Sequence, residues 1–392
     1  MIFKYLIIVV TLFAMILFGC STDNNLSDSS SSDKQLYIVK FLEDSAPQLQ
    51  STSNNLRRSY IDKILTDESI ATAEVVYYYD NLFTACAVYL TNDEYSRISI
   101  NKNVEYVEQD QIITIDDELI PANKGEQLMG ETVSWGTTAV GGTSPATSST
   151  GVAWIVDSGV DLTHPDLNIN TTLTKTFVKK SQDSKTANDL NGHGTHCAGI
   201  IAAKNNTIGS LGVCAGATVI GVKVLNAQGS GSITDIVNGL NYVAGKLISG
   251  KLNVVNLSLG GSANTTLDNA VISLANKGAI IVVAAGNSAK DCSTFSPARV
   301  NHSNVYTISA HNEQYKLSSY SNFGAPVDYS APGDLIYSTY KNNGYATMSG
   351  TSMATPHVAG ILLANNGSIN FNGYITGDKD SWPDKRAVRI VE

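Results

Sequence analysis

The chain has 392 residues, of which 43% are hydrophobic and 16% are charged. This length and composition allow a large core and more than one domain, and they exclude a disordered chain. The net charge of −9 includes no basic run, which argues against nucleic acid as a partner.

The first predicted element is an apolar run at 6–18 that follows Lys4. The run is short for a membrane span and has the length of a signal-peptide core. It ends in Leu17-Phe18-Gly19-Cys20, which resembles a bacterial lipobox. The resemblance implies that residues 1–19 are removed and that Cys20 is diacylated, which would hold the protein on a membrane surface. The alternative is an ordinary signal peptide or an anchor helix with a chance cysteine.

A stretch rich in Ser, Asp and Asn follows, and residues 20–35 are predicted to form a flexible tether. The four remaining cysteines are widely scattered, which predicts buried free thiols and no disulfide framework. They are Cys86, Cys197, Cys214 and Cys292.

Residues 36–115 have the pattern of a small α+β module. Strands are predicted at 36–41, 74–79 and 82–90, and a last strand begins at Val104 and continues toward Ile115. Helices are predicted at 54–65 and after the capping box Thr91-Asn92-Asp93-Glu94. The order strand–helix–strand–strand–helix–strand is that of a ferredoxin-like fold. Residues 116–132 are polar and poorly periodic, which predicts a processing linker.

The remainder, 133–392, is predicted to be a doubly wound α/β domain with a mostly parallel sheet and helices on both faces. Its apolar runs suit strands that are buried on both sides. These runs are Gly151–Val156, Thr218–Leu225, Asn253–Leu259, Ala279–Ala285 and Val305–Ser309. Two amphipathic helices lie between them, one from Ser232 to near Gly250 and one that ends at Gly278.

A further helix is predicted to begin near Thr351, so that Ser352 lies at its mouth. Unpaired N–H groups and the positive end of the helix dipole stabilise a developing oxyanion at such a position. Pro356 would leave the Ser352 carbonyl unpaired within the helix, which a purely structural helix would avoid. The alternative is a core helix of small residues with an incidental serine.

A serine hydroxyl becomes a nucleophile when an imidazole takes its proton and a carboxylate orients that imidazole. His193 opens another predicted helix, in Asn191–Gly199. Asp157 ends a buried strand, at the sheet edge where α/β proteins form their sites.

Five motifs, in order, resemble those of the subtilisin-like serine proteases (subtilases), in both the proteinase K and the subtilisin branches. They are DSG at 157–159, HGTHCAG at 193–199, VNLSLGG at 255–261, AAGN at 284–287 and GTSMA at 350–354. Residues 36–115 resemble the inhibitory propeptide of the same proteases.

The resemblance implies that Asp157, His193 and Ser352 form the catalytic triad. It makes Asn287 the side-chain donor of the oxyanion hole, beside the backbone N–H of Ser352. A turn-forming asparagine is the alternative for Asn287.

The resemblance also assigns substrate-binding segments. Two of them, Ser258-Leu259-Gly260 and Gly229-Ser230-Gly231, would sandwich the substrate as an added β-strand. A third, Ala284-Ala285-Gly286, would line the pocket for the residue before the scissile bond. Its small walls leave room for apolar or aromatic side chains, which predicts broad specificity.

Structural Ca²⁺ is the cofactor that the resemblance implies. Asp166 would supply a carboxylate, and the loop that contains Lys204, Asn206, Ile208 and Ser210 would supply an amide and carbonyl oxygens. Glu131 falls near the position of the family's N-terminal amide ligand, where a carboxylate is a departure. An asparagine-rich surface turn is the alternative.

The sequence therefore predicts a serine endopeptidase that is made as a self-processing zymogen. Polypeptides would be its substrates, its own propeptide its intramolecular inhibitor, and the enzyme would be a monomer. The lipobox-like segment predicts an extracytoplasmic, membrane-anchored or cell-surface protein whose catalytic domain is released on processing. Two alternatives are a catalytically silent surface binding protein and a metal hydrolase that uses Asp157, His193 and His196.

Overall fold

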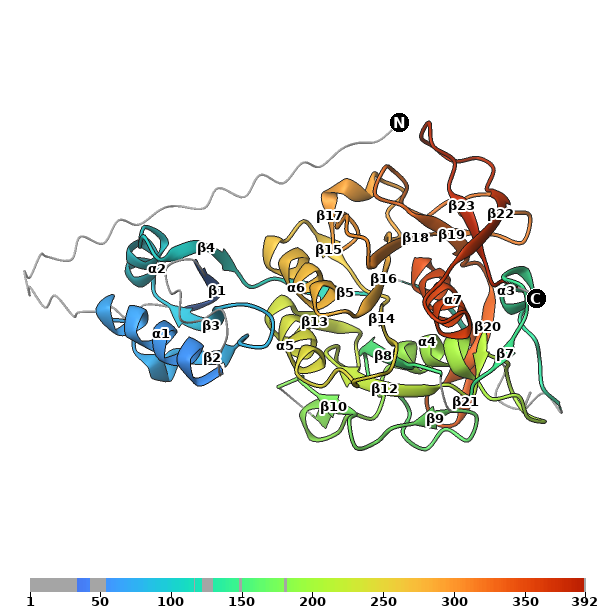
Figure 1. Cartoon of the computed structure of the whole chain (residues 1–392), viewed down its shortest axis with the longest axis horizontal. Coiled ribbons are helices and arrows are strands. Elements are labelled where there is room, and N and C mark those ends of the chain that lie inside the picture. The colour runs from blue at the N-terminus through green and yellow to red at the C-terminus, as the bar shows by residue number, and fades with distance from the viewer. Residues whose placement is uncertain are drawn as a thin grey trace, which may run out of the picture. The chain divides into compact units, whose positions relative to one another are not determined.

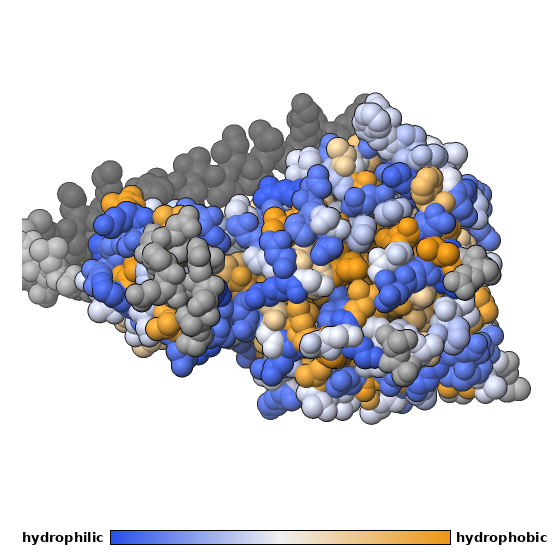
Figure 2. Space-filling view, in the orientation of Figure 1, coloured by the Kyte–Doolittle hydropathy of each residue, from blue (hydrophilic) through white to orange (hydrophobic). Residues whose placement is uncertain are grey.

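A computed structural model of the chain describes residues 34–42, 54–115, 117–121, 130–147, 150–179 and 182–390 (Figure 1). The predicted signal peptide, Cys20 and most of the predicted tether lie outside these residues. Within the described ranges, no helix has both the length and the apolar character needed to cross a membrane. Polar residues dominate the visible surface, with apolar residues scattered among them (Figure 2).

The N-terminal module has the predicted ferredoxin-like order. Its elements are β1 (Gln35–Phe41), α1 (Asn54–Asp67), β2 (Val75–Tyr78), β3 (Ala85–Leu90), α2 (Asn92–Ser99) and β4 (Val104–Gln109), with a short 3₁₀ turn at Thr72–Glu74. The strands form one antiparallel sheet in the order β2-β3-β1-β4. The predicted capping box opens α2, because the Thr91 hydroxyl accepts from Glu94 N and the Glu94 carboxylate accepts from Thr91 N.

The two faces of this small sheet are buried against different partners. Val39 and Val88 pack with α1 and α2 in a core of their own. Ile38 and Ala87, which alternate with them, belong instead to the core that contains α5 and α6 of the larger domain. The module therefore has an apolar face that the larger domain covers.

The prediction that the last strand of the module continues from Val104 toward Ile115 is wrong. β4 ends at Gln109, and a separate strand β5 (Ile112–Thr114) joins another sheet. The chain changes direction at Asp110, because the Asp110 carboxylate accepts a hydrogen bond from Thr234 N at 2.9 Å. Ile233 N also donates to Gln111 O. These bonds to the start of α5 turn the chain away from the small sheet.

The larger domain is built on a ten-stranded sheet. Its central strands are β8 (Val152–Asp157), β12 (Thr218–Lys223), β14 (Asn253–Leu257), β16 (Ile280–Ala284), β18 (Val305–His311) and β19 (Tyr329–Pro332). The edges are β9 (Asn168–Ile169), β10 (Lys175–Thr176), β22 (Asn370–Tyr374) and β23 (Lys385–Val388). The order is β10-β12-β8-β14-β16-β18-β19-β23-β22, with β9 beside β12. Every pairing is parallel except that of β22 with β23.

Helices cover both faces of this sheet, which confirms the predicted doubly wound class (Figure 1). α4 (His193–Ala202) and α7 (Thr351–Ala364) pack on one face with Ala153 and Ile155 of β8. α5 (Ile233–Ala244) and α6 (Thr265–Asn276) pack on the other face with Trp154 and Val156. Alternate residues of one strand thus face two different cores, which explains its continuous apolar run.

α5 ends earlier than predicted, at Ala244 instead of near Gly250. The loop after it is organised by Asn253, whose side chain accepts from Ile248 N and donates to the carbonyls of Ile248 and Lys251. These bonds hold the backbone in a non-helical path, so the apolar periodicity at Leu247 does not continue the helix.

Shorter elements complete the domain. They are α3 (Trp135–Ala139), β6 (Glu118–Pro121), β7 (Ser144–Pro145), β11 (Cys214–Ala215), β13 (Ser230–Ser232), β15 (Gly261–Ser262), β17 (Phe295–Ser296), β20 (Ile336–Tyr340), β21 (Gly344–Ser349), and 3₁₀ turns at Gln182–Lys185 and Cys292–Thr294. The segment after α7 is not an appendage, because β23 extends the main sheet and Arg389 N donates to Val140 O.

Candidate active site

Ser352 is the second residue of α7, as predicted, and its side chain is buried. Its hydroxyl donates to Ser258 O at 3.2 Å. Pro356 lies inside the helix, and the Ser352 carbonyl that it frees is paired from outside. The Ser258 hydroxyl donates to that carbonyl at 2.8 Å, and the Cys197 thiol lies 3.5 Å from it. The helix mouth is therefore tied to β14 and α4 by bonds that an unbroken helix would not need.

Asp157 and His193 are in direct contact. Asp157 is the last residue of β8, His193 is the first residue of α4, and His193 Nδ1 lies 2.8 and 2.9 Å from the two carboxylate oxygens. Gly194 permits this approach, because a Cβ there would lie 2.1 Å from Gly159 O and 3.1 Å from Asp157 Cβ. The carboxylate thus fixes which ring nitrogen of His193 faces away from it.

The protonation of His193 is set by two opposing effects. Burial alone would lower its pKa, but the charge of Asp157 and hydrogen bonds to Asp117 and Asp157 together raise the pKa well above the ordinary value. The imidazolium form is therefore stabilised at the position where a general base must accept a proton.

Two buried charged residues that the sequence analysis did not single out support this pair. Asp189 accepts from Gly192 N, Thr195 N and the Thr195 hydroxyl at 2.8, 2.9 and 2.6 Å, and so organises the start of α4. Lys223 is fully buried and donates to Ser158 O at 2.6 Å, directly after Asp157. The sequence did contain a signal for Lys223, because this lysine lies within the apolar run Thr218–Leu225 that is predicted to be a buried strand.

Asn287 follows β16 and is oriented by α7. Its Oδ1 accepts from Thr351 N at 2.9 Å and from the Thr351 hydroxyl at 2.8 Å. Because both lone-pair directions of the amide oxygen are used, Nδ2 is directed away from Thr351. That nitrogen donates at 2.8 Å to the carboxylate of Asp117.

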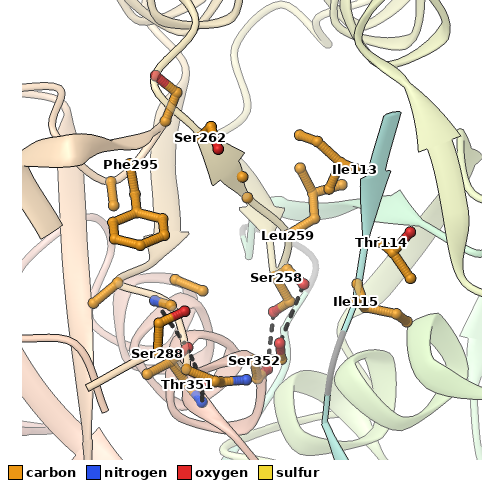
Figure 3. Close-up of a pocket in the computed structure, with 18 of the residues that line it drawn as sticks. Ile113, Thr114, Ile115, Ser258, Leu259, Ser262, Ser288, Phe295, Thr351 and Ser352 are labelled. Carbon is orange, nitrogen blue, oxygen red and sulfur yellow. Dashed lines mark hydrogen bonds between the residues drawn. The ribbon is translucent and has the colours of Figure 1, made fainter. Parts of the chain in front are cut away.

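Two of the three predicted substrate segments line one pocket beside Ser352 (Figure 3). Ser258, Leu259 and Gly260 form one wall, and the segment Ala284-Ala285-Gly286 contributes to the same pocket. Ile113, Thr114 and Ile115 of the chain itself also line this pocket, beside Ser258 and Leu259 and across from Phe295 and Ser288 (Figure 3). The pocket therefore already has a peptide segment beside it.

This segment is paired as a β-strand with the third predicted substrate segment. β5 is antiparallel to β13, with Ile113 opposite Gly231 and Thr114 opposite Ser230. Ile115 N donates to Gly229 O at 3.0 Å. Gly229 has φ +76°, a conformation that favours glycine, and a Cβ there would lie 2.6 Å from the Ile115 side chain.

The chain leaves the site along a second strand that the sequence analysis assigned to the linker. β6 is antiparallel to β21, with Glu118 opposite Ser349. Between the two strands, Asp117 Oδ2 lies 2.9 Å from His193 Nε2. Residues 117–121 of the predicted linker thus lie against the larger domain, with Asp117 at His193.

The other histidines have structural contacts. His196 Nε2 lies 3.1 Å from both Ile336 O and Ala346 O, and burial lowers its pKa to about 3. The ring is therefore not directed at Asp157, which removes the basis for the metal-hydrolase alternative. Among the described residues, one group of three metal-ligating side chains has its ligand atoms within 4.8 Å, namely Asp157, His193 and Cys197 of the site itself.

The predicted Ca²⁺ ligands are partly brought together. Asp166 is fully buried and accepts from Asn206 Nδ2 at 2.8 Å and Ser210 N at 3.1 Å. Glu131 Oε1 accepts from Asn206 N, so this departure from the family pattern does lie at the loop. The Ser210 hydroxyl is buried and has no hydrogen-bond partner among the described residues. A buried carboxylate with further oxygen donors nearby fits a hard cation. Lys204 Nζ donates to Pro165 O, and Ile208 N to Asn206 Oδ1, so both residues lie in the same loop.

The four cysteines of the described residues, Cys86, Cys197, Cys214 and Cys292, are free and buried, as predicted. Burial raises the pKa of the Cys197 thiol to about 12. Burial therefore favours the protonated thiol at this position, beside Asp157 and His193.

Comparison with known proteins identifies the family to which the chain belongs. The subtilase family model matches residues 148–365, and the peptidase inhibitor I9 model matches residues 36–116. The M-protease of Shouchella clausii is 32% identical, over 88% of this chain and 85% of the relative. Proteinase R of Parengyodontium album is 32% identical, over 81% of each chain. Thermitase of Thermoactinomyces vulgaris is 43% identical, over 54% of this chain and 74% of the relative.

A solved structure agrees with the fold. The crystal structure of a cold adapted subtilisin-like serine proteinase is 33% identical, with a TM-score of 0.55, and the match covers 64% of this chain and 92% of that one. With the family model, the relatives and the fold in agreement, the chain belongs to the subtilase family, as a serine endopeptidase preceded by an I9 propeptide.

Proposed function

We propose that Ser352 is the nucleophile of this endopeptidase, with His193 as its general base and Asp157 as the residue that orients His193. His193 Nε2 takes the proton of Ser352 Oγ as the oxygen attacks the scissile carbonyl, and later gives it to the leaving amine. Water then hydrolyses the acyl-enzyme by the same route. The observation that carries the proposal is the contact of Asp157 with His193 Nδ1 at 2.8 Å, which leaves Nε2 for this exchange.

Stabilisation of the transition state is assigned to Asn287 and the N-terminus of α7. Charge develops on the carbonyl oxygen, so donors that are already in place lower the barrier most. The proposal is supported by the bonds from Thr351 to Asn287 Oδ1, which fix the amide with Nδ2 toward the site. The backbone N–H of Ser352 would be the second donor.

The proposal is tested by combining substitutions in the triad. Ser352→Ala, His193→Ala and Asp157→Asn should each slow self-cleavage of the full-length chain by orders of magnitude, measured as the residual rate over a long time course. Because the three side chains act as one unit, the double variants should lose little beyond the worst single variant. Losses that add up independently, or a Ser352→Ala chain that cleaves itself at the wild-type rate, would refute the assignment.

Self-processing is proposed to occur in the segment that connects the propeptide module to the catalytic domain. The proposal is supported by the strand pairings of β5 with β13 and of β6 with β21, with Asp117 at His193 between them. The scissile bond is therefore assigned to the segment from Ile115 to Glu118. N-terminal sequencing of the processed enzyme tests this: a new terminus after Glu118 would contradict it.

Peptide substrates are proposed to bind as an added strand between Gly229-Ser230-Gly231 and Ser258-Leu259-Gly260. The antiparallel pairing of β5 with the first of these segments supports this geometry. The Ala284-Ala285-Gly286 segment would receive the side chain before the scissile bond, with a preference for apolar or aromatic residues. The rival proposal, a silent binding protein, lacks support from the relatives, whose names are those of proteases.

We further propose that Asp166, Asn206 and the carbonyls of their loop hold Ca²⁺, which would neutralise the buried Asp166 carboxylate. Glu131 lies at the same loop and would add a second carboxylate. The expected role is structural, since Asp166 is not among the residues of the catalytic site.

Finally, we propose an extracytoplasmic enzyme that is tethered through diacylated Cys20 until it is processed. The propeptide lies between Cys20 and the catalytic domain, so cleavage would cut the covalent link to the membrane. Membranes that carry wild type or Ser352→Ala chains should be washed with urea, which removes non-covalently bound propeptide complexes. Wild-type catalytic domain should be released and the Ser352→Ala chain retained. Equal retention of both would overturn release.

A further inference from the structure

Asp117 lies in the catalytic site, although the proposed reaction does not use its side chain. Its side chain is almost fully buried, at 2% exposure, and its two carboxylate oxygens have different partners in the catalytic site. Oδ2 lies 2.9 Å from His193 Nε2, and Oδ1 accepts from Asn287 Nδ2 at 2.8 Å. One carboxylate thus bridges the general base and the oxyanion-hole donor.

Each of these contacts diverts a group that acylation needs. His193 Nε2 must be unprotonated to take a proton from Ser352, but a carboxylate at 2.9 Å favours the protonated ring. Asn287 Nδ2 must be open to the substrate oxygen, but it donates to Asp117. The Ser352 hydroxyl itself donates to Ser258 O. Nucleophile, base and oxyanion donor are therefore all occupied in other hydrogen bonds or ion pairs.

The backbone holds Asp117 in this place. The preceding strand is fixed by the bond from Ile115 N to Gly229 O, and the following strand by the pairing of Glu118 with Ser349. Gly350 provides the space, because a Cβ at that position would lie 1.9 Å from Asp117 Oδ1. The carboxylate is thus positioned by two strands and accommodated by a glycine directly before the catalytic helix.

The charges explain why a carboxylate suits this position. A negative group between an imidazolium and an amide donor reproduces the charge that the site is built to bind in the transition state. We infer that Asp117 is an autoinhibitory residue, whose carboxylate binds as an internal oxyanion mimic and suppresses self-cleavage of the zymogen until it leaves the site. The inference rests on the proposed triad and oxyanion hole, and it adds a local inhibitor to the docking of the propeptide as a whole.

The test uses the full-length chain and measures the first-order rate of self-cleavage after refolding. Asp117→Asn keeps the shape and removes the charge, and Asp117→Ala removes both. Each should cleave itself at least ten times faster than wild type. A rate that is unchanged or lower in both variants would overturn the inference.

Two control variants distinguish loss of the Asp117 carboxylate from loss of any propeptide charge and from weaker docking of the propeptide. Glu105→Gln removes a propeptide carboxylate whose ion-pair partner, Lys40, also belongs to the propeptide, so the cleavage rate should stay within twofold of wild type. Glu108→Gln weakens docking, because the Glu108 carboxylate accepts from Thr265 N and Thr266 N at the start of α6. If Glu108→Gln accelerates cleavage as much as Asp117→Asn, loosened docking explains the result and the inference fails.

A second measurement is independent of turnover. In the Ser352→Ala chain, which should remain intact, the His193 ring is titrated by NMR with and without Asp117→Asn. The pKa of His193 should fall by at least one unit in the Asp117→Asn chain, and an unchanged pKa would refute the contact. If the proposed function itself were wrong, the processed enzyme would not hydrolyse peptides, and this result is distinct from an unchanged cleavage rate or an unchanged His193 pKa.

Discussion

At the level of single residues, the start of α7 depends on a hydrogen bond from Ser258, which replaces the backbone bond that Pro356 cannot make. Pro356 has no N–H to offer the Ser352 carbonyl, and the Ser258 hydroxyl donates to that carbonyl instead at 2.8 Å. The Ser352 hydroxyl meanwhile donates to the Ser258 carbonyl. The two serines therefore fix each other, and through them β14 fixes the start of α7.

We expect Ser258→Ala to leave a buried carbonyl without its main donor. The cost of such a loss is about 1–3 kcal/mol, which should lower Tm by several degrees and reduce kcat through a less well-fixed nucleophile. Thermal unfolding and peptide hydrolysis measure both. Ser262→Ala, in the same pocket wall, is the matched control. Equal behaviour of the two variants would show that the bond to Ser352 is unimportant.

At the scale of elements, most of the fold followed from apolar patterning. The central strands are buried on both faces, so their residues form continuous runs that sequence alone can locate, as at 152–157 and 253–257. The edge strands β22 and β23 were not predicted, because they are short and partly exposed and carry no such run. The end of α5 was misplaced because the side chain of Asn253 binds the backbone of Ile248 and sets the loop after the helix, which apolar periodicity alone does not show.

The proposed triad and Asn287 could be predicted from the sequence, because each residue stands in a short motif that resembles a subtilase motif. Asp117 could not be assigned in this way. Its position depends on β5 and β6 pairing with strands more than 100 residues away, and a polar stretch at 116–132 gives no sign of that.

The C-terminal hairpin provides a prediction at the same scale. Burial, opposed by a bond from Ser309 and reinforced by Asp378, Asp380 and Asp328, raises the pKa of Asp384 to about 7. A carboxyl whose pKa is higher in the folded state stabilises the fold fully below its unfolded pKa, about 3.9, and that contribution is lost as pH rises toward 7. Asp384→Asn does not ionise, so it should escape this loss.

The measurement is urea unfolding of Ser352→Ala chains between pH 4 and pH 8, with and without Asp384→Asn. The stability of the Asp384→Asn chain relative to its parent should increase with pH, by an amount on the order of a few kcal/mol. A difference that stays constant with pH would show that Asp384 does not titrate in this range.

At the scale of the whole molecule, the propeptide and the catalytic domain share a core. Residues from Lys34 onward group into one compact unit, and Ile38 and Phe83 of the propeptide pack in the same cluster as Leu240 and Leu267 of α5 and α6. An apolar face of this kind would be exposed in the isolated module. The propeptide therefore buries this apolar face against the domain that it inhibits.

Removal of Ca²⁺ should lower the stability of the processed enzyme. A ligand at about 100 times its Kd stabilises the fold by about 2.7 kcal/mol, so a chelator should reduce Tm by several degrees, and Ca²⁺ but not Mg²⁺ should restore it. Asp166→Asn should abolish this dependence while the triad stays intact. A chelator-insensitive Tm in the wild type would exclude the proposed Ca²⁺ site.

The central claim is that one buried hydroxyl at the start of α7 carries the chemistry. Incubation of the processed enzyme with a fluorophosphonate, followed by mass spectrometry of the digested protein, tests it most directly. We expect one label per molecule, on Ser352, with loss of peptide hydrolysis in proportion to labelling. Full hydrolytic activity in a protein whose Ser352 is completely labelled, or a label on another residue that accompanies the loss of activity, would contradict it.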